Sequence, residues 1–200
     1  MVLDNRKRQI LVFSLMALAV IIDQVIKIAV KTNMELGEAI YVCGEWCQIR
    51  FIENPGMAFG MELFSKFFLT SFRVIAVGLL FYYLLKLLRE GKQPLGYILC
   101  IAFILAGAMG NLVDCLFYGE IFSDSYGKVA EFVSWGDGYA SFMHGKVVDM
   151  FYFPLFTWPD WMPIVGGDIF FGPVFNFADA CVSCAMVALL IYYRNIILKD

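Results

Sequence analysis

Long apolar runs separated by polar segments set the pattern of hydrophobic and polar positions along this chain. Four runs are long enough to cross a bilayer as helices, because a hydrocarbon core about 30 Å thick requires about 20 helical residues. The pattern predicts these helices at residues 10–30, 64–88, 95–113 and 176–198, joined by two long loops at residues 31–63 and 114–175. It therefore predicts an all-α polytopic membrane protein with four transmembrane helices and an extended loop.

The first of these helices follows three basic residues, Arg6, Lys7 and Arg8, as the apolar part of a secretory signal peptide would. No small-x-small cleavage site follows it, however. We therefore expect residues 10–30 to remain in the protein as a membrane helix.

Composition supports the membrane assignment. Of the 200 residues, 61% are hydrophobic and 16% are charged, and the mean hydropathy of +0.74 lies outside the range of soluble domains. The net charge of −3 is too small to indicate nucleic-acid binding. We expect one membrane-embedded domain over residues 1–200, a monomer whose partners are membrane lipids and lipid-borne molecules.

The distribution of charge predicts the orientation, because short cytoplasmic loops keep an excess of Lys and Arg. Basic residues gather at both termini and between the second and third helices: Arg6, Lys7, Arg8, Lys86, Arg89, Lys92, Arg194 and Lys199. The long segment 114–174 instead carries eight acidic residues against two lysines. Both termini are therefore expected in the cytoplasm, and both long loops outside it.

On this topology, six polar residues of the apolar helices fall in the outer leaflet. They are Asp23, Lys27, Asn111, Asp114, Asn176 and Asp179. Two N-x-x-D pairs, "NLVD" and "NFAD", each place an amide and a carboxylate on one helical face, since residues three apart are neighbours there. We expect these faces to converge.

A further acid, Asp149, lies in "HGKVVDMFYFP", a short apolar run that suggests a loop returning to the membrane surface. Its aromatic neighbours have the composition of an interfacial belt, where such rings settle at headgroup depth. These neighbours are Phe151, Tyr152, Phe153, Trp158 and Trp161.

Each acid also has a simpler interpretation. Asp23 and Lys27, four residues apart, form an internal ion pair or contact a substrate. Asp114 and Asp179 alone would be helix-end residues in the headgroups, and Asp149 alone a solvated acid. Yet a carboxylate in hydrocarbon costs about 3 kcal/mol, so such groups persist mainly when they are paired, wetted or used.

Taken together, the acids point to a chemistry that needs two neighbouring carboxylates in a partly dry site. Such a pair shares one proton near neutral pH, so that one acid takes a proton from water while the other protonates a carbonyl oxygen. This is aspartic peptidase chemistry, with no metal, cofactor or covalent intermediate. The lone His144 makes a zinc site improbable, and no Ser or Cys lies in a nucleophile elbow.

Two other classes of protein remain open. A proton-coupled transporter would use the same acids as a relay, although it should show inverted repeats or paired broken helices. A non-enzymatic assembly factor would use them as buried polar contacts.

Five sequence blocks together resemble lipoprotein signal peptidase, also called signal peptidase II. In chain order they are "IIDQVIK", "ENPGMAFG", "GAMGNLVD", "GKVVDMFYF" and "FNFADA". The resemblance implies a four-helix aspartic endopeptidase of the bacterial inner membrane, with its active site at the outer leaflet. Such an enzyme removes the signal peptide from diacylglyceryl-modified prolipoproteins just before the lipidated cysteine.

The resemblance also assigns residues. It makes Asp149 and Asp179 the catalytic pair, and it needs no metal or cofactor. The family's supporting polar residues then fall on Asp23, Asn54, Asn111, Asp114 and Asn176. We expect Lys27, four residues from Asp23, and Gly56 among the substrate-binding and supporting residues as well. The segment "AIYVCGEWCQIRFIENPG" resembles a small extramembrane β-sheet that cradles the substrate, with Gly56 allowing close approach of backbone.

Two departures from the family pattern stand out. The Arg that usually follows the third block's Asp is replaced by Cys115, and we expect Arg73 to reach the outer interface or pair with an acid rather than take its place. The loop 115–145 is longer than usual, and we expect a surface excursion without catalytic residues. Cys43 and Cys47, both in the first outer loop, leave a local disulfide open.

Overall fold

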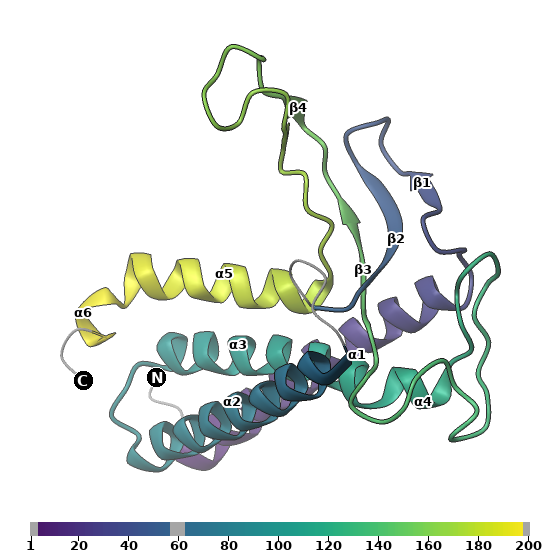
Figure 1. The fold of residues 1–200 in the computed structure, drawn as a ribbon. Helices are drawn as coiled ribbons and strands as arrows, with labels where there is room; N and C mark the ends of the chain where they lie inside the picture. The colour runs from purple at the N-terminus through teal and green to yellow at the C-terminus, as the bar shows by residue number, and fades with distance from the viewer. Residues whose placement is uncertain (1–3, 57–62, 198–200) are drawn as a thin grey trace.

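The computed structural model describes residues 4–56 and 63–197. Four helices make up its main body: α1 (Asn5–Lys31), α2 (Leu63–Glu90), α3 (Leu95–Val113) and α5 (Phe177–Tyr192). A short α6 (Arg194–Ile197) follows α5, at the end of the bundle where both termini lie (Figure 1). Three parts of the expected elements lie outside the described residues: residues 57–60 of the second sequence block, the rest of that loop to residue 62, and residue 198 of the fourth expected helix.

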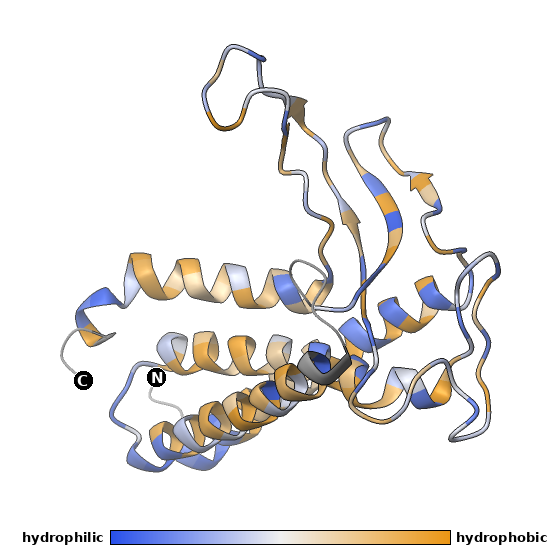
Figure 2. Cartoon of the chain, viewed as in Figure 1, coloured by the Kyte–Doolittle hydropathy of each residue, from blue (hydrophilic) through white to orange (hydrophobic). Residues whose placement is uncertain are grey.

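Among the described residues, three helical stretches are long and apolar enough to cross a membrane: Asn5–Lys31, Lys66–Glu90 and Leu95–Ile121. The 16 residues of α5 are also apolar, but at 1.5 Å per residue they extend only about 24 Å. Large apolar side chains such as Phe72, Leu79 and Leu190 are exposed on these helices, and Figure 2 shows hydrophobic residues along the lengths of the helices. Such surfaces suit a lipid environment.

Helix α3 lies at the centre of the bundle and packs against α1, α2 and α5. Its buried residues include Ile98, Leu105 and Ala106, which belong to one core cluster with residues of the neighbouring helices. The approach to α5 depends on Gly107, because a Cβ at that position would lie 2.6 Å from Val182 Cγ2. Small residues thus bring the two helices into close contact.

The expected third helix, residues 95–113, has the same bounds as α3, but no loop begins at its end. The helix continues through a π-helical turn, η1 (Asp114–Tyr118), and through α4 (Gly119–Ile121). Asp114 is consequently fully buried within a helix instead of marking the start of a loop. Its charge suggested a helix end, but Lys27 neutralises it inside the protein.

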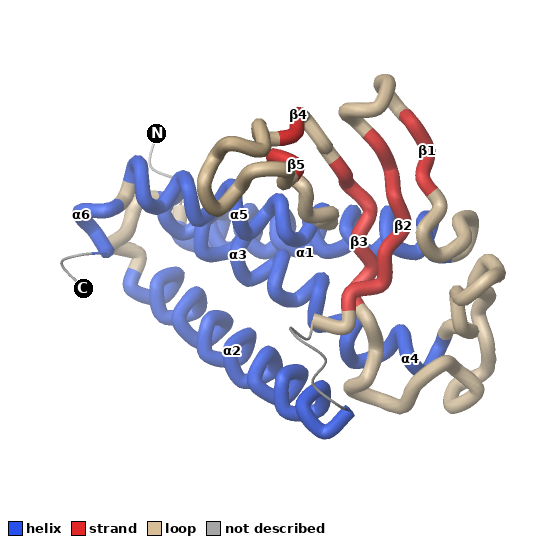
Figure 3. Tube along the Cα trace, turned by 45° about the horizontal axis from the view of Figure 1, so that its top comes forward, coloured by secondary structure: helices blue, strands red, loops and turns tan. Residues whose placement is uncertain are grey.

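Two small antiparallel sheets accompany the helices, so the expected all-α description is incomplete. The first has the order β1-β2-β3 and consists of β1 (Ala39–Tyr41), β2 (Gln48–Asn54) and β3 (Val147–Tyr152) (Figure 3). The second pairs β4 (Phe156–Thr157) with β5 (Ile169–Phe170). The resemblance implied strands before residue 56, but β3 and the β4–β5 hairpin come from the segment expected to be loop. Cys43 and Cys47 are free thiols.

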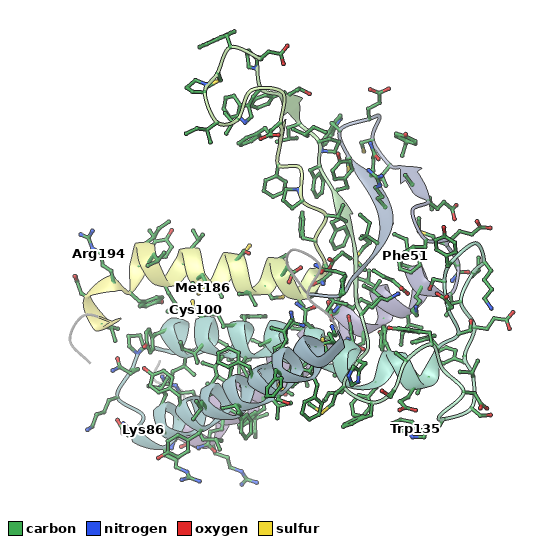
Figure 4. All side chains as sticks on the ribbon, in the orientation of Figure 1. Phe51, Lys86, Cys100, Trp135, Met186 and Arg194 are labelled. Atoms are coloured by element: carbon green, nitrogen blue, oxygen red, sulfur yellow. The ribbon has the colours of Figure 1, made fainter. Side chains whose placement is uncertain are left out.

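The two ends of the bundle differ in chemistry. Lys86 and Arg194 lie at the end that carries both termini, whereas Phe51 and Trp135 lie at the end with the three-stranded sheet (Figure 4). The two labelled residues at the first end are both basic, and the second end holds the sheet and the long segment that follows α4.

This long segment, residues 122–146, is exposed over much of its length, as expected of a surface excursion, but charged and polar groups also connect it to the sheet. The Lys31 ammonium, fully buried, pairs with Glu53 and donates to Ser125 Oγ at 2.8 Å. Lys146 Nζ lies 2.9 Å from the second Glu53 oxygen. Burial alone would raise the pKa of Glu53, but the Lys31 and Lys146 ammonium groups outweigh burial and lower it below its ordinary value.

We expect Glu53→Gln to destabilise the protein by about 3 kcal/mol or more, because it leaves the Lys31 charge buried without a counter-charge. Unfolding titrations in mixed detergent micelles measure this loss. Since the pKa of Glu53 is lowered on folding, its contribution is fully present above the ordinary value of 4.5 and is lost as pH falls through the folded-state pKa.

The matched control is Glu90→Gln, which removes an exposed i,i+4 pair with Lys86. It should change the free energy of unfolding by less than about 0.5 kcal/mol. Equal effects of the two substitutions would contradict a structural role for the buried network.

Candidate active site

Asp149 lies in strand β3, and not in the surface loop expected from the sequence. Ile52 lies opposite Asp149 and Val147 lies opposite Asn54, so Asn54 and Asp149 are diagonal neighbours on one face of the sheet. The Asn54 Nδ2 group donates to Asp149 Oδ2 at 3.2 Å. Only 3% of the Asp149 surface is exposed.

The other edge of β3 brings the start of α5 to Asp149. Phe151 exchanges backbone hydrogen bonds with Phe175, at 2.7 and 3.0 Å. Asn176 follows directly and forms the N-cap of α5, where its side chain accepts from Asp179 N and the Asp179 side chain accepts from Asn176 N. This capping box fixes the direction of the Asp179 side chain.

Two asparagine side chains connect the two acids. Asn176 Nδ2 donates to Asp149 Oδ1 at 2.7 Å and to Asn111 Oδ1 at 3.0 Å. Asn111 Nδ2 in turn donates to Asp179 Oδ1 at 2.8 Å. Residues from β3, α3 and α5 thus form one hydrogen-bonded cluster, and the faces of the two N-x-x-D pairs do converge.

Lys27 holds this cluster from α1. Its ammonium, fully buried, lies 2.9 Å from Asp23 Oδ2 and 2.8 Å from Asp114 Oδ2, and it donates to Asn111 Oδ1 at 2.8 Å. Asp23 and Lys27 therefore form the ion pair that their spacing suggested. Asp114, fully buried, does not lie free at a helix end.

The two aspartates that neutralise Lys27 also bind backbone groups beside the site. Asp23 Oδ1 accepts from Ala178 N at 2.9 Å, and Asp114 Oδ2 accepts from Val148 N at 3.2 Å. Ala178 and Val148 immediately precede Asp179 and Asp149 in the chain. Lys27, Asp23 and Asp114 are thus connected to Asp149 and Asp179 through the residue that precedes each of these two acids.

Gln24 is a member of the site that sequence reasoning missed. Its Nε2 group donates to Asp114 Oδ1 at 3.0 Å and to Gly110 O at 3.1 Å, while Tyr118 OH donates to its Oε1 at 3.1 Å. Its polar side chain beside Asp23 in an otherwise apolar helix was the signal that could have revealed it.

Burial raises the pKa of Asp149 to about 6, and the nearby Asp179 charge adds to the rise. Hydrogen bonds from Asn54 and Asn176 act in the opposite sense, because they favour the charged form. A carboxyl group with this pKa can hold a proton near neutral pH and still release it.

Gly56 and Arg73 complete the surroundings of the site. Gly56 has a φ of +67°, and its N–H donates to Asn54 Oδ1 at 2.8 Å. The group that approaches it closely is the Arg73 side chain, since a Cβ here would lie 2.7 Å from Arg73 Nη2. Arg73 Nη1 contacts Cys115 Sγ at 2.8 Å. Among the described residues Arg73 forms no ion pair with an acid, so of its two expected positions only the one at the outer interface remains a prediction.

An apolar cleft opens beside Asp179. Its volume is about 500 Å³, and Phe171, Phe175, Ala180 and Cys184 line it with Asp179. Across residues 4–56 and 63–197, the His, Cys, Asp and Glu side chains form no cluster of three or more that could hold a metal ion. The chemistry available here is that of two acids with amide and cation partners.

Comparison with known proteins identifies the family. The family model described as signal peptidase (SPase) II matches residues 15–195. The chain belongs to the signal peptidase II family. A protein of Porphyromonas gingivalis named lipoprotein signal peptidase is 50% identical over 186 residues, which cover 91% of this chain and 82% of that protein. One of Amoebophilus asiaticus with the same name is 36% identical over 188 residues, covering 90% and 75%.

The fold is also similar to that of solved structures. A solved structure described as a bacterial membrane enzyme matches with a TM-score of 0.63 at 23% identity, over 94% of this chain and 93% of that chain. A second structure described in the same words matches with a TM-score of 0.61 at 23% identity, over 94% and 88%. The resemblance carried by the five sequence blocks is thus confirmed at the level of the family.

The bridging role of Asn176 can be separated from its role as an N-cap by Asn176→Asp. An Asp at this position still caps the helix, but it faces Asp149 and Asn111 Oδ1 with an acceptor where the amide donated. We expect a lower unfolding temperature at pH 8 and partial recovery at pH 5, because protonation of the added carboxyl group removes the repulsion.

Thermal unfolding in detergent at the two pH values measures this effect, with Asn33→Asp, an exposed position, as the control. A variant as stable as the parent at pH 8 would mean that Asn176 acts only as a cap.

Proposed function

We propose that this chain is a membrane aspartic endopeptidase that removes the signal peptide from diacylglyceryl-modified prolipoproteins, cutting just before the lipidated cysteine. The relatives named lipoprotein signal peptidase support this substrate class. The observation that carries the proposal is the joining of Asp149 and Asp179 through Asn176 and Asn111.

In the proposed mechanism, Asp149 and Asp179 share one proton. One acid removes a proton from the attacking water while the other protonates the carbonyl oxygen of the scissile peptide, and the roles reverse as the amine leaves. The pKa of about 6 at Asp149 supports its role as the acid that holds the shared proton near neutral pH. No cofactor or covalent intermediate takes part.

The remaining polar residues orient this pair and bind the substrate backbone. Asn54, Asn111 and Asn176 hold the carboxylates by hydrogen bonds. The buried Lys27, with Asp23 and Asp114, fixes Asn111 and the backbone beside each acid. Gly56 leaves room at the rim of the site.

In the membrane, we place the chain as a single domain with four spans, the fourth made of α5 together with α6. The basic end that holds Lys86 and Arg194 faces the cytoplasm with both termini, and the sheet and active site lie at the outer leaflet of the bacterial inner membrane. The protein acts as a monomer that binds membrane lipids and its precursor substrate, and it does not bind nucleic acid.

The cleft beside Asp179 supports recognition of a lipid-modified substrate. Its lining is apolar apart from Asp179 and Ser183, so an acyl chain can lie in it while the peptide reaches the acids. Peptide and lipid are then recognised together.

We expect the purified protein in detergent to cut a lipidated precursor peptide immediately before the modified cysteine, and to leave the same peptide without lipid largely uncut. Asp149→Asn and Asp179→Asn should each lower the rate by at least about a hundredfold, because each removes a group that transfers a proton. Mass spectrometry of the products gives the cleavage position and the rate.

Asp137→Asn, which changes an exposed acid away from the site, is the control and should keep the parent rate. Both site variants should still bind the lipidated peptide. Full turnover by either one would exclude the proposed pair, and a transporter or assembly factor would cut neither peptide.

The pH dependence of cleavage should respond to Asn54. The active pair holds one proton, so the rate falls on the alkaline side as Asp149 loses it, with an apparent pKa near 6. Asn54→Ala removes a hydrogen bond that favours the charged carboxylate and therefore raises the pKa of Asp149. The alkaline limb of the rate profile should move to higher pH.

Rates measured between about pH 5 and 9 test this shift, with the exposed Asn33→Ala as the control. Movement of the alkaline limb to lower pH would rule out this role for Asn54.

A further inference from the structure

Helix α2 carries two cations near its beginning, Lys66 and Arg73, in an otherwise apolar stretch. They are seven residues apart, about two helical turns, and therefore share one face. Lys66 is buried, with 3% of its surface exposed, and Arg73 is partly buried. Placing such charges within an apolar span costs about 3 kcal/mol each, so a use for them is expected.

Both cations converge on the residue that follows Asp114. Arg73 Nη1 lies 2.8 Å from Cys115 Sγ, and Lys66 Nζ lies 3.9 Å from the same sulfur while donating to Pro55 O at 2.6 Å. A thiol sulfur is a weak acceptor. Within the described part of the chain, neither cation forms an ion pair with a carboxylate.

The Arg73 guanidinium lies between two segments that hold the site. On one side is Gly56, whose N–H binds Asn54, the hydrogen-bond donor to Asp149. On the other side is Cys115, next to Asp114, which binds the N–H of Val148. Both contacts of Arg73 thus lie within two residues of a side chain that bonds to Asp149 or to Val148, the residue before it.

Space for the guanidinium is built into the backbone. A side chain at Gly56 would collide with Arg73 Nη2, and the φ of +67° there disfavours any residue with a Cβ. A planar group with five N–H donors is therefore held between Gly56 and Cys115, and the Cys115 sulfur is only a weak acceptor for it.

We propose that Arg73 is a substrate-binding residue that donates to backbone carbonyl oxygens of the precursor beside the scissile bond. This inference rests on the proposed peptidase function. The guanidinium comes from α2, and it contacts Cys115, the position where the family pattern has an arginine. Lys66 acts differently, since it fixes the Pro55 carbonyl and so the approach to Gly56.

The test removes the arginine at position 73 and then introduces one at position 115. Arg73→Ala should lower kcat/KM for the lipidated peptide about tenfold to a hundredfold, as expected for loss of hydrogen bonds from a charged donor. The double variant Arg73→Ala with Cys115→Arg should recover most of this loss, because it returns a guanidinium to the same place. Arg73→Lys keeps the charge without the planar donors and should recover only part.

Direct binding provides a second measurement that does not depend on turnover. On an Asp149→Asn background, Arg73→Ala should weaken binding of the lipidated peptide by a similar factor, with an unchanged unfolding temperature. Arg89→Ala, an exposed cation at the far end of α2, is the matched control and should change neither value.

The outcomes separate this inference from the function on which it rests. If the parent protein cuts and Arg73→Ala cuts equally well, Arg73 does not bind substrate and the peptidase assignment stands. If the parent binds the peptide but does not cut it, the peptidase assignment fails. If Arg73→Ala proves unstable, the double variant decides: a folded double variant without recovered activity overturns the role of Arg73.

Discussion

The buried ammonium group of Lys27 is the interaction on which the rest of the site depends. It lies between Asp23 of its own helix and Asp114 beyond α3, and it also binds Asn111. A buried charge without counter-charges would cost several kcal/mol, so these helices are held in one arrangement. Because Asp23 binds the first turn of α5, the same charge also fixes the position of Asp179.

Lys31, one turn further along α1, repeats this arrangement at the sheet. It pairs with Glu53, which precedes Asn54 in β2, and thereby joins the helix end to the strand that contacts Asp149. Two lysines spaced four residues apart thus hold the two structural halves of the site, the helix bundle by Lys27 and the sheet by Lys31. The long segment after α4 reinforces the second half through Ser125, which also donates to Glu53.

The sequence predicted those features of the site that depend on residues close together in the chain, and it missed specific contacts that join distant segments. The N-x-x-D faces converged as expected, because helical spacing and the order of apolar runs determine them. The third strand could not be predicted, since its pairing with β2 joins Asp149 to Ile52 across almost a hundred residues, and no local pattern sets that register. The contact of Arg73 with Cys115 could not be predicted for the same reason, because Cys115 belongs to another helix.

The two proposed catalytic acids are held in unlike surroundings, and this difference suits the proposed division of roles. Asp149 lies on a buried strand, where loss of solvent raises its pKa to about 6. Asp179 lies in the first turn of α5, where its side chain accepts from Asn176 N in the capping box and from Asn111 Nδ2. Burial thus favours the protonated form of Asp149, whereas the helix cap fixes the direction of the Asp179 side chain, and Asn176 bonds to both residues. The proposed pair is therefore asymmetric because two different elements hold it: a buried strand carries one acid, and the first turn of a helix carries the other.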